Sequence, residues 1–552
     1  MSHEAEELLD RSDLSPNNRL DSWKEIAAYL KCSERTVRRW EQEGLPIHRH
    51  PHKKKAGIYA YKAEIDAWWR NGHERLKQFD VVPAQKVSRR RILAVLGLPA
   101  LVLAIAVFTT RTVREHFSHK PVSATIQSVA VLPLEDLSHD PEQEYFADGM
   151  TDALITDLAK IHALRVISRN SIMQYKGNHK PMPQIAHELH VDAVVEGTVM
   201  RSGGRVRITA QLIEAPTDRH LWAETYERDL RDVLGLQDEV ARSIASEVKV
   251  TLTPQEQSGL SNARQVNPAA NEAYLRGYYE LRKHPPATLY RAGEEQSISK
   301  AIQYFQLAIA IDPNDALAYA GLADAYYDQS TFLRAPLEVM PKAKAAAVRA
   351  LELDGTMAEA HASLANIKMT FDWDWPGAER EFQRALELNP NLPQAHAGYS
   401  RYFLALHRAD EAIQELDRVQ AIDPIFPQSH MALPLLLFDA RRYLEAIEAA
   451  KASGDDRALA LSLAELGRNE EAIVAADRAV KSTQNLIVSA QVASAYALAG
   501  KPNIARAMLT TIEAKARQRY LCGFNVSCIY ATLGDKKRAF SWLEKAYLAR
   551  SD

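Results

Sequence analysis

The sequence has few of the residues and motifs that support covalent or metal chemistry. It contains three cysteines among 552 residues, Cys32, Cys522 and Cys528, which are too few for a disulfide framework and form no Cys-x-x-Cys pair. A Walker phosphate loop and a Gly-x-Ser-x-Gly motif are both absent, and the His-Glu-Leu-His segment at 187–190 is one residue short of the His-Glu-x-x-His zinc motif. We therefore expect a protein that is not an enzyme and has no cofactor or metal ion.

A strong net charge is lacking as well. The formal charge of −3 for the whole chain indicates no partner by itself, so the charge has to be counted segment by segment. The composition of 46% apolar and 25% charged residues excludes a mostly disordered or collagen-like protein. Since a domain has roughly 100–200 residues, this length predicts several domains.

One long uncharged run interrupts the chain. Residues 92–110 hold nineteen residues without a charge, which at ~1.5 Å per residue nearly match a ~30 Å hydrocarbon core. We predict one transmembrane helix over 91–112, with the lipid bilayer as a partner. Residues 74–91 carry six Lys and Arg and residues 111–128 carry three, so we expect the bacterial inner membrane, a cytoplasmic amino terminus and extracytoplasmic carboxyl-terminal domains.

The segment before this run has the pattern of a helix-turn-helix. Ser22 and Glu25 form a capping-box pattern that begins a first helix, and residues 33–41 predict a second helix with Val37 turned inward. The basic turn that follows, a predicted strand over 58–61 and a closing helix over 63–69 complete a wing.

These elements resemble the MerR/excisionase-like winged helix-turn-helix family. The resemblance rests on the motifs S-W-K-E-I-A-A-Y-L, R-T-V-R-R-W-E, G-L-P-I-H-R-H and Y-K-A-E-I-D-A-W-W. Residues 21–70 contain eleven Lys and Arg against seven Asp and Glu, and this excess of +4 favours DNA binding by displacing counterions from phosphates. The resemblance implies DNA contacts by Arg35, Thr36, Arg38, Arg39, Arg49, His50, Lys53, Lys54 and Lys55. The alternative is that these side chains are solvated surface charges.

Residues 123–255 alternate between strand and helix patterns. We predict strands over 128–134, 164–168, 193–200, 205–213 and 220–226, and helices over 151–161, 182–189 and 236–248. Ser202-Gly203-Gly204 is a hairpin signal. Asp148 and Asp152 lie near a predicted helix start, where a capping role is expected in preference to a catalytic pair.

This region resembles the TolB amino-terminal-like (FlgO-related) domain. The resemblance is carried by V-A-V-L-P-L-E-D-L-S, Y-F-A-D-G-M-T-D-A-L-I, L-R-V-I-S-R-N-S, V-E-G-T-V, R-V-R-I-T-A-Q-L-I and H-L-W-A-E-T-Y-E-R-D-L. It implies an α/β fold without enzymatic activity.

The carboxyl-terminal half contains a repeated sequence pattern. Ile311-Asp312-Pro313, Leu353-Asp354-Gly355, Leu388-Asn389-Pro390 and Ile422-Asp423-Pro424 are 42, 35 and 34 residues apart, and the last two spacings are typical of tetratricopeptide repeats. We expect the extra residues of the first spacing to form a loop near 331–340, because Pro336 favours one. Stacked repeats form a superhelix whose concave face binds a protein or peptide. A spacer or self-association arm is the alternative.

The predicted fold class is multidomain, and its function is that of a membrane-anchored one-component transcription regulator that forms a homodimer on adjacent DNA half-sites. An envelope scaffold whose head docks protein is the alternative, and a signalling enzyme is disfavoured because no catalytic motif is present. The predicted parts are a disordered tail (1–20), a winged helix-turn-helix (21–72), a basic linker (73–90), a transmembrane helix (91–112), an α/β TolB amino-terminal-like domain (123–255) and an all-α tetratricopeptide superhelix (268–552).

Overall fold

The computed structural model describes most of the chain after residue 125 and parts of the chain before it. The described residues are 18–30, 37, 45–49, 58–73 and 126–551, without 139, 141–142, 179, 216, 260–265, 284–293, 426, 483–484 and 517–519. They belong to two compact units, Met1–Lys120 and Pro121–Asp552.

The first unit is a small sheet with helices. Its described elements are β1 (Arg19–Leu20), α1 (Trp23–Tyr29), β2 (His48–Arg49), β3 (Ile58–Tyr61) and α3 (Lys62–His73), and the antiparallel sheet has the order β1-β3-β2. Ser22 Oγ accepts a hydrogen bond from the Glu25 amide at 3.2 Å, which confirms the predicted start of α1. The predicted strand over 58–61 and the closing helix are also confirmed. The predicted second helix over 33–41 lies outside the described residues except for Val37, which is helical and fully buried.

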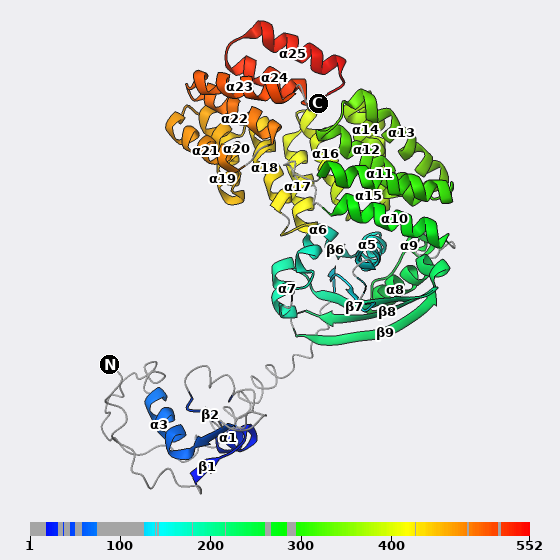
Figure 1. The fold of residues 1–552 in the computed structure, drawn as a ribbon, viewed down its shortest axis with the longest axis vertical. Coiled ribbons are helices and arrows are strands. Elements are labelled where there is room, and N and C mark those ends of the chain that lie inside the picture. Colours follow the sequence, from blue (N-terminus) through cyan, green and yellow to red (C-terminus); the bar gives the residue numbers. More distant parts are fainter. Residues whose placement is uncertain are drawn as a thin grey trace, which may run out of the picture. The chain divides into compact units, whose positions relative to one another are not determined.

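The second unit begins with an α/β domain. Its strands are β4 (Ser128–Val131), β5 (Glu135–Asp136), β6 (Arg165–Val166), β7 (Ala193–Ser202), β8 (Arg205–Glu214) and β9 (Arg219–Asp229), and its helices are α5 (Glu144–Ala159), α6 (Arg169–Ile172), α7 (Met182–Leu189), α8 (Val233–Glu247) and α9 (Pro254–Gly259). The sheet order is β6-β4-β7-β8-β9, with β5 paired to β7. Strands β4 and β6 are parallel, whereas β7, β8 and β9 are antiparallel (Figure 1).

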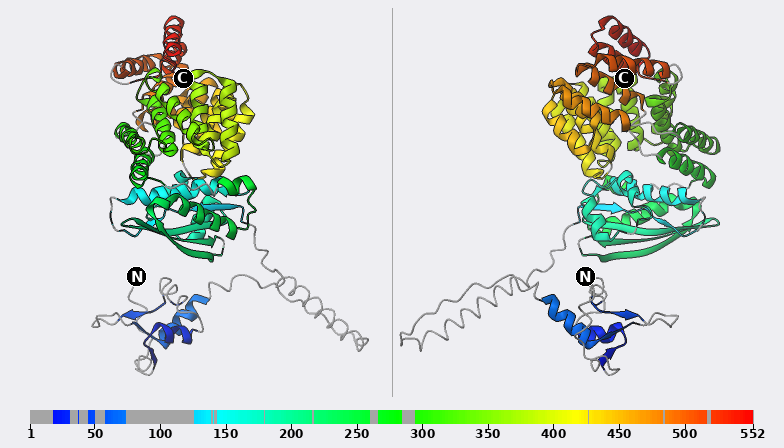
Figure 2. Two further views of the ribbon diagram at one scale, coloured as in Figure 1. Left: turned by 90° about the vertical axis from the view of Figure 1, so that its right-hand side faces the viewer. Right: turned by 60° about the vertical axis from the view of Figure 1, so that its left-hand side comes forward.

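The sheet follows the predicted pattern closely. Ser202 pairs with Arg205 across the Gly203-Gly204 turn, in which Gly203 has a φ of 58° that favours glycine. Alternate residues of β8 from Val206 to Leu212 are fully buried. Helices α5 and α8 cover this apolar face and lie between the sheet and the carboxyl-terminal helices (Figure 2).

One helix of this domain begins earlier than predicted. Helix α5 begins at Glu144 and not near Thr151, so Asp148 and Asp152 lie within the helix. The predicted capping role is therefore wrong. Asp148 is 5% exposed and both acids face basic groups of a neighbouring segment, which a pattern of local helix signals does not reveal.

The rest of the second unit is an array of helical hairpins. It consists of α10 (Pro268–Arg282), α11 (Glu294–Ile311), α12 (Ala316–Phe332), α13 (Pro336–Leu353), α14 (Ala358–Ile367), the π-helical turn η5 (Lys368–Asp372), α15 (Trp375–Leu388), α16 (Pro393–Ala405), α17 (Ala409–Ile422), α18 (Pro427–Asp439), α19 (Tyr443–Ser453), α20 (Asp456–Glu465), α21 (Asn469–Ser482), α22 (Leu486–Leu498), α23 (Pro502–Ala516), α24 (Gly523–Thr532) and α25 (Lys536–Leu548). Consecutive pairs pack against each other from α10/α11 to α24/α25. The apolar faces are rich in alanine, which lets neighbouring helices approach closely.

The predicted repeat spacing is confirmed, but the predicted loop near 331–340 is limited to residues 333–335. Helices α11, α13, α15 and α17 end at Ile311, Leu353, Leu388 and Ile422, the positions that defined the spacing. Pro336 is the first residue of α13, where its missing amide hydrogen has no helical partner to lose. The extra residues of the first spacing therefore lengthen α12 and α13 to 17 and 18 residues.

The carboxyl terminus returns to an earlier part of the array. The Trp373 ring, directly after η5, stacks on the Tyr547 ring with centroids 5.0 Å apart. The Arg550 guanidinium lies 3.8 Å from the centroid of the Trp373 ring, and Arg550 Nη1 donates a hydrogen bond to the Phe371 carbonyl at 3.3 Å. The array from η5 to α25 is thus closed by contacts between residues 179 positions apart (Figure 1).

The structure contradicts the predicted membrane span. A bilayer-crossing helix needs about 20 consecutive apolar residues. No helix among the described residues is both long and apolar enough, since α11 and α13, at 18 residues each, contain three and five charged residues. The predicted span at 91–112 itself lies outside the described residues. Three predictions are therefore wrong: the single-span fold class, the bilayer as a partner, and the inner-membrane localisation with extracytoplasmic domains.

Candidate functional site

The predicted DNA-contact residues are only partly covered by the structure. Arg49 lies on β2 and is exposed. The neighbouring His48 joins β2 to α3, because its Nε2 lies 2.7 Å from Glu64 Oε2 and its ring stacks on Tyr59 with centroids 5.2 Å apart. These contacts hold the strand that carries Arg49. The other predicted residues lie outside the described residues: Arg35, Thr36, Arg38, Arg39, His50, Lys53, Lys54 and Lys55.

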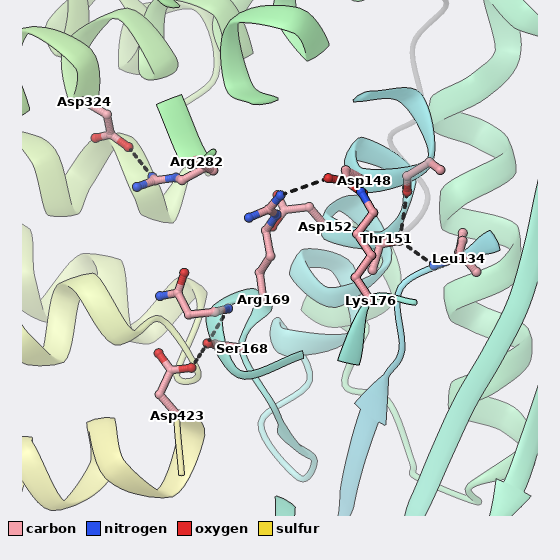
Figure 3. Close-up of polar contacts among 12 residues, drawn as sticks. Leu134, Asp148, Thr151, Asp152, Ser168, Arg169, Lys176, Arg282, Asp324 and Asp423 are labelled. Atoms are coloured by element: carbon pink, nitrogen blue, oxygen red, sulfur yellow. Dashed lines mark hydrogen bonds and ion pairs between the residues drawn. The ribbon is translucent and has the colours of Figure 1, made fainter. Parts of the chain in front are cut away.

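A polar network lies where the α/β domain of the second unit meets the helical array (Figure 3). Arg169 Nη2 is 3.6 Å from Asp148 Oδ2, and Arg169 Nε is 3.9 Å from Asp152 Oδ1. Lys176 forms a further ion pair with Asp148. Burial nevertheless raises the pKa of both carboxyls above their usual range. The desolvation of these acids therefore outweighs the attraction of their cationic neighbours.

The network continues into the repeats. The Tyr278 hydroxyl on α10 and the Arg282 guanidinium both favour the charged form of Asp152, and the guanidinium lies 5.5 Å from the Tyr278 ring centroid. Arg282 Nη2 donates to Asp324 Oδ2 on α12 at 3.1 Å, and Asp324 also accepts a hydrogen bond from Ser363 on α14. A continuous chain of polar contacts thus runs from α5 through α10 to α14.

A second contact fixes the amino terminus of α6 to the repeats. The Ser168 amide donates to the Ile422 carbonyl at 3.0 Å. The Asp423 carboxylate, 2% exposed, accepts hydrogen bonds from the Ser168 hydroxyl and from the Ser171 amide, the latter at 3.3 Å. The α/β domain is therefore held by backbone as well as side-chain hydrogen bonds at the end of α17.

Asn391 makes a third contact between these parts. Its Nδ2 donates to the carbonyls of Ala159 and Leu164 at 3.1 and 3.0 Å. The sequence patterns did not predict the roles of Asn391 and Asp423 in joining these parts. Both residues lie at or just after the sequence positions that define the repeat spacing. Their hydrogen-bond partners, however, are more than 200 residues away in the sequence.

We expect the Asp423→Ala variant to loosen this contact. The change leaves the buried Ser171 amide without its acceptor, at a cost of about 1–3 kcal/mol. Urea-induced unfolding measures the loss, and hydrogen exchange of residues 165–172 shows where it occurs. Asp417→Ala on the exposed side of α17 is the matched control. Equal stability and equal exchange in the two variants would mean that Asp423 does not hold the α/β domain.

A cavity of about 570 Å³ lies beside this network, between α5 and α8 of the α/β domain and the first helices of the array, including α10 and α12. Asp238 of α8 and Tyr274 of α10 line it. Burial, and next the nearby Asp157 carboxylate, raise the pKa of Asp238 to about 7. Within the described parts of the chain, no group of three or more His, Cys, Asp and Glu side chains is arranged to hold a metal ion.

Comparisons with known families match both parts of the second unit. Residues 125–243 match the second domain of a HilA/YgeH-like transcriptional regulator, and residues 374–433 and 524–552 match tetratricopeptide repeats. The predicted repeats are thereby confirmed. The resemblances of the α/β domain to the TolB amino-terminal-like domain and of the head to the MerR/excisionase-like family stay predictions.

Individual proteins match parts of the chain. The putative adenylate cyclase 3 of Rhizobium meliloti (strain 1021) is 34% identical over 294 residues, 52% of this chain and 41% of that protein. The small glutamine-rich tetratricopeptide repeat-containing protein 2 of Mycosarcoma maydis is 34% identical over 76 residues, 14% of this chain and 22% of that protein. The structure of yeast Tom70 is 14% identical, with 57% of this chain and 75% of Tom70 covered at a TM-score of 0.34.

This chain therefore spans less than half the length of the curated relatives that it matches. What the chain itself contains is a HilA/YgeH-like regulator domain joined to tetratricopeptide repeats. Together these parts indicate a regulatory or protein-interaction role, and they point away from an enzymatic one.

Proposed function

We propose that the chain is a non-enzymatic transcription regulator that binds DNA through its amino-terminal head and a protein or peptide through its repeats. The observation that carries the proposal is the match of residues 125–243 to a domain of a transcriptional regulator. The charge of the head supports it, because residues 21–70 carry an excess of +4, and basic charge supplies most sequence-independent DNA affinity.

The proposed DNA contacts come from two segments of the head. The second helix of the resembled family lies in the major groove, where arginines read guanine edges, and Arg38 and Arg39 fall within the predicted second helix. We propose that Arg49, which is exposed on β2, contacts a phosphate. The remaining proposed contacts are Arg35, Thr36, His50, Lys53, Lys54 and Lys55.

We expect replacement of both Arg38 and Arg39 by Ala to weaken DNA binding by ~2 kcal/mol or more, since a bidentate arginine–guanine pair contributes about that much. The measurement is fluorescence anisotropy of the full chain at fixed salt, with duplexes selected from a random-sequence library. The double variant Arg468→Ala/Arg478→Ala is the matched control, because it removes two exposed arginines near α21.

The outcomes separate the two candidate functions. Loss of affinity in the head variant alone supports a DNA-binding regulator. If the parent chain selects no sequence and its weak binding disappears at moderate salt, the second candidate replaces the first. That candidate is a scaffold whose repeats assemble proteins, and the length of the helical array from α10 to α25 favours it.

A further inference from the structure

We propose that the cavity between the α/β domain and the first repeats binds a small organic cation, an aliphatic amine whose ammonium group pairs with Asp238. This site goes beyond the proposed function and does not depend on it, because it needs neither DNA nor a protein partner.

The size and walls of the cavity fit a small organic molecule. Its volume of about 570 Å³ lies within the roughly 300–1,000 Å³ of small-molecule sites and is far larger than a single hydrated ion requires. Apolar and aromatic side chains from different elements form part of its wall, including Leu275, Tyr274 and Tyr278 of α10 and Leu317 of α12. Aromatic ring faces attract ammonium groups, and leucines cover an aliphatic chain.

The charge of the wall is predominantly negative. The carboxylates that line the cavity are Asp152, Asp157, Asp238, Glu256, Asp354 and Glu387. Lys160 and His162 are the basic side chains of this lining. Lys160 Nζ is paired with Asp157 Oδ1 at 2.7 Å, and His162 Nδ1 lies 3.1 Å from Glu256 Oε1. Both basic groups are therefore already engaged by acids.

Asp238 is the carboxylate that remains. It is 9% exposed, and no hydrogen bond or ion pair joins its carboxylate to another described residue. Lys160 and Arg242 favour its charged form from a distance, whereas burial and Asp157 oppose it more strongly. A buried carboxylate without a paired cation is costly, and an ammonium group in the cavity would offset that cost.

Ligand binding at this place has a structural consequence. The walls belong both to the α/β domain, through α5 and α8, and to the repeats, through α12 and α15. A molecule that contacts both parts stabilises their packing, so the melting temperature should rise with its concentration. The cavity is thus a site through which a metabolite-sized cation stabilises the junction.

The test uses the full chain and the diamine putrescine as the probe, titrated by isothermal calorimetry at pH 8, where Asp238 is mostly charged. We expect saturable binding of putrescine, a higher melting temperature, and no comparable binding of butanediol or succinate, which are of similar length but neutral or anionic. Binding of magnesium chloride in place of putrescine, or equal binding of butanediol, would overturn the proposal. So would the absence of saturable binding at millimolar putrescine.

The Asp238→Asn variant identifies the partner of the ammonium group. It should bind putrescine at least about tenfold more weakly, because the amide keeps the shape and removes the charge. Asp410→Asn, which removes one highly exposed negative charge on α17, should bind like the parent. The melting temperature of each ligand-free variant shows that it is folded. A folded Asp238→Asn variant with unchanged affinity would refute the assignment.

Discussion

The Phe382→Ala variant is expected to lose about 3–5 kcal/mol of unfolding free energy, the usual cost of removing a buried phenylalanine. Phe382 on α15 is fully buried and stacks on the Tyr399 ring of α16 with centroids 5.4 Å apart. The ring also fills the space above Gly398, where an added Cβ would lie 2.6 Å from it. Helices α15 and α16 are each held by further neighbours, so they cannot close the cavity that alanine leaves.

Urea-induced unfolding followed by circular dichroism at the helical band measures this loss. Phe540→Ala on α25 is the matched control, because that ring is 70% exposed and the same truncation should change stability by less than about 0.5 kcal/mol. Similar losses in both variants would mean that α15 and α16 do not pack around Phe382. Phe305 occupies the equivalent place against Gly277 and Gly321, so the same contact recurs along the array.

The second large effect is a pH dependence that arises from Asp238. An aspartate in an unfolded chain has a pKa near 4, whereas burial and the Asp157 carboxylate raise the pKa of Asp238 to about 7 in the folded protein. Between these values the folded state binds more protons than the unfolded state, so the unfolding free energy falls as pH rises. The groups that face Asp238 are Asp157 and Lys160 from the α5 segment and Arg242 from its own helix.

We therefore expect the parent chain to lose stability relative to Asp238→Asn between about pH 4 and pH 7, by on the order of 2–4 kcal/mol. Urea-induced unfolding of both proteins at each pH gives the difference. Glu188→Gln is a control of opposite sign, because hydrogen bonds from Lys180 and Tyr175 lower the pKa of Glu188 to about 2. The stability due to Glu188 is present above its ordinary pKa and is lost as pH falls. A pH-independent difference between the parent and Asp238→Asn would contradict a buried, titrating Asp238.

Local patterns in the sequence were sufficient for most elements of the α/β domain and for the spacing of the repeats. Helix α7 has the predicted limits 182–189, and the β7–β8 hairpin turns at the predicted glycines. The repeat ends at Leu353, Leu388 and Ile422 also follow from spacing alone. These features depend on contacts between near neighbours in the chain, namely alternation, turn residues and helical hairpins, so their signals are contained in short windows.

The contacts that join the α/β domain to the helical array were determined only by the tertiary structure. The roles of Asp148, Asn391 and Asp423 depend on partners in segments that the sequence separates, and the unpaired Asp238 becomes visible only once α5, α8 and the first repeats enclose a cavity. An acid near a helix start has the same local pattern whether it caps the helix or is buried in an ion pair. Burial distinguishes the capping acid from the acid in an ion pair. Burial depends on which helices, distant in the sequence, pack over the residue, and a local sequence pattern does not predict that packing.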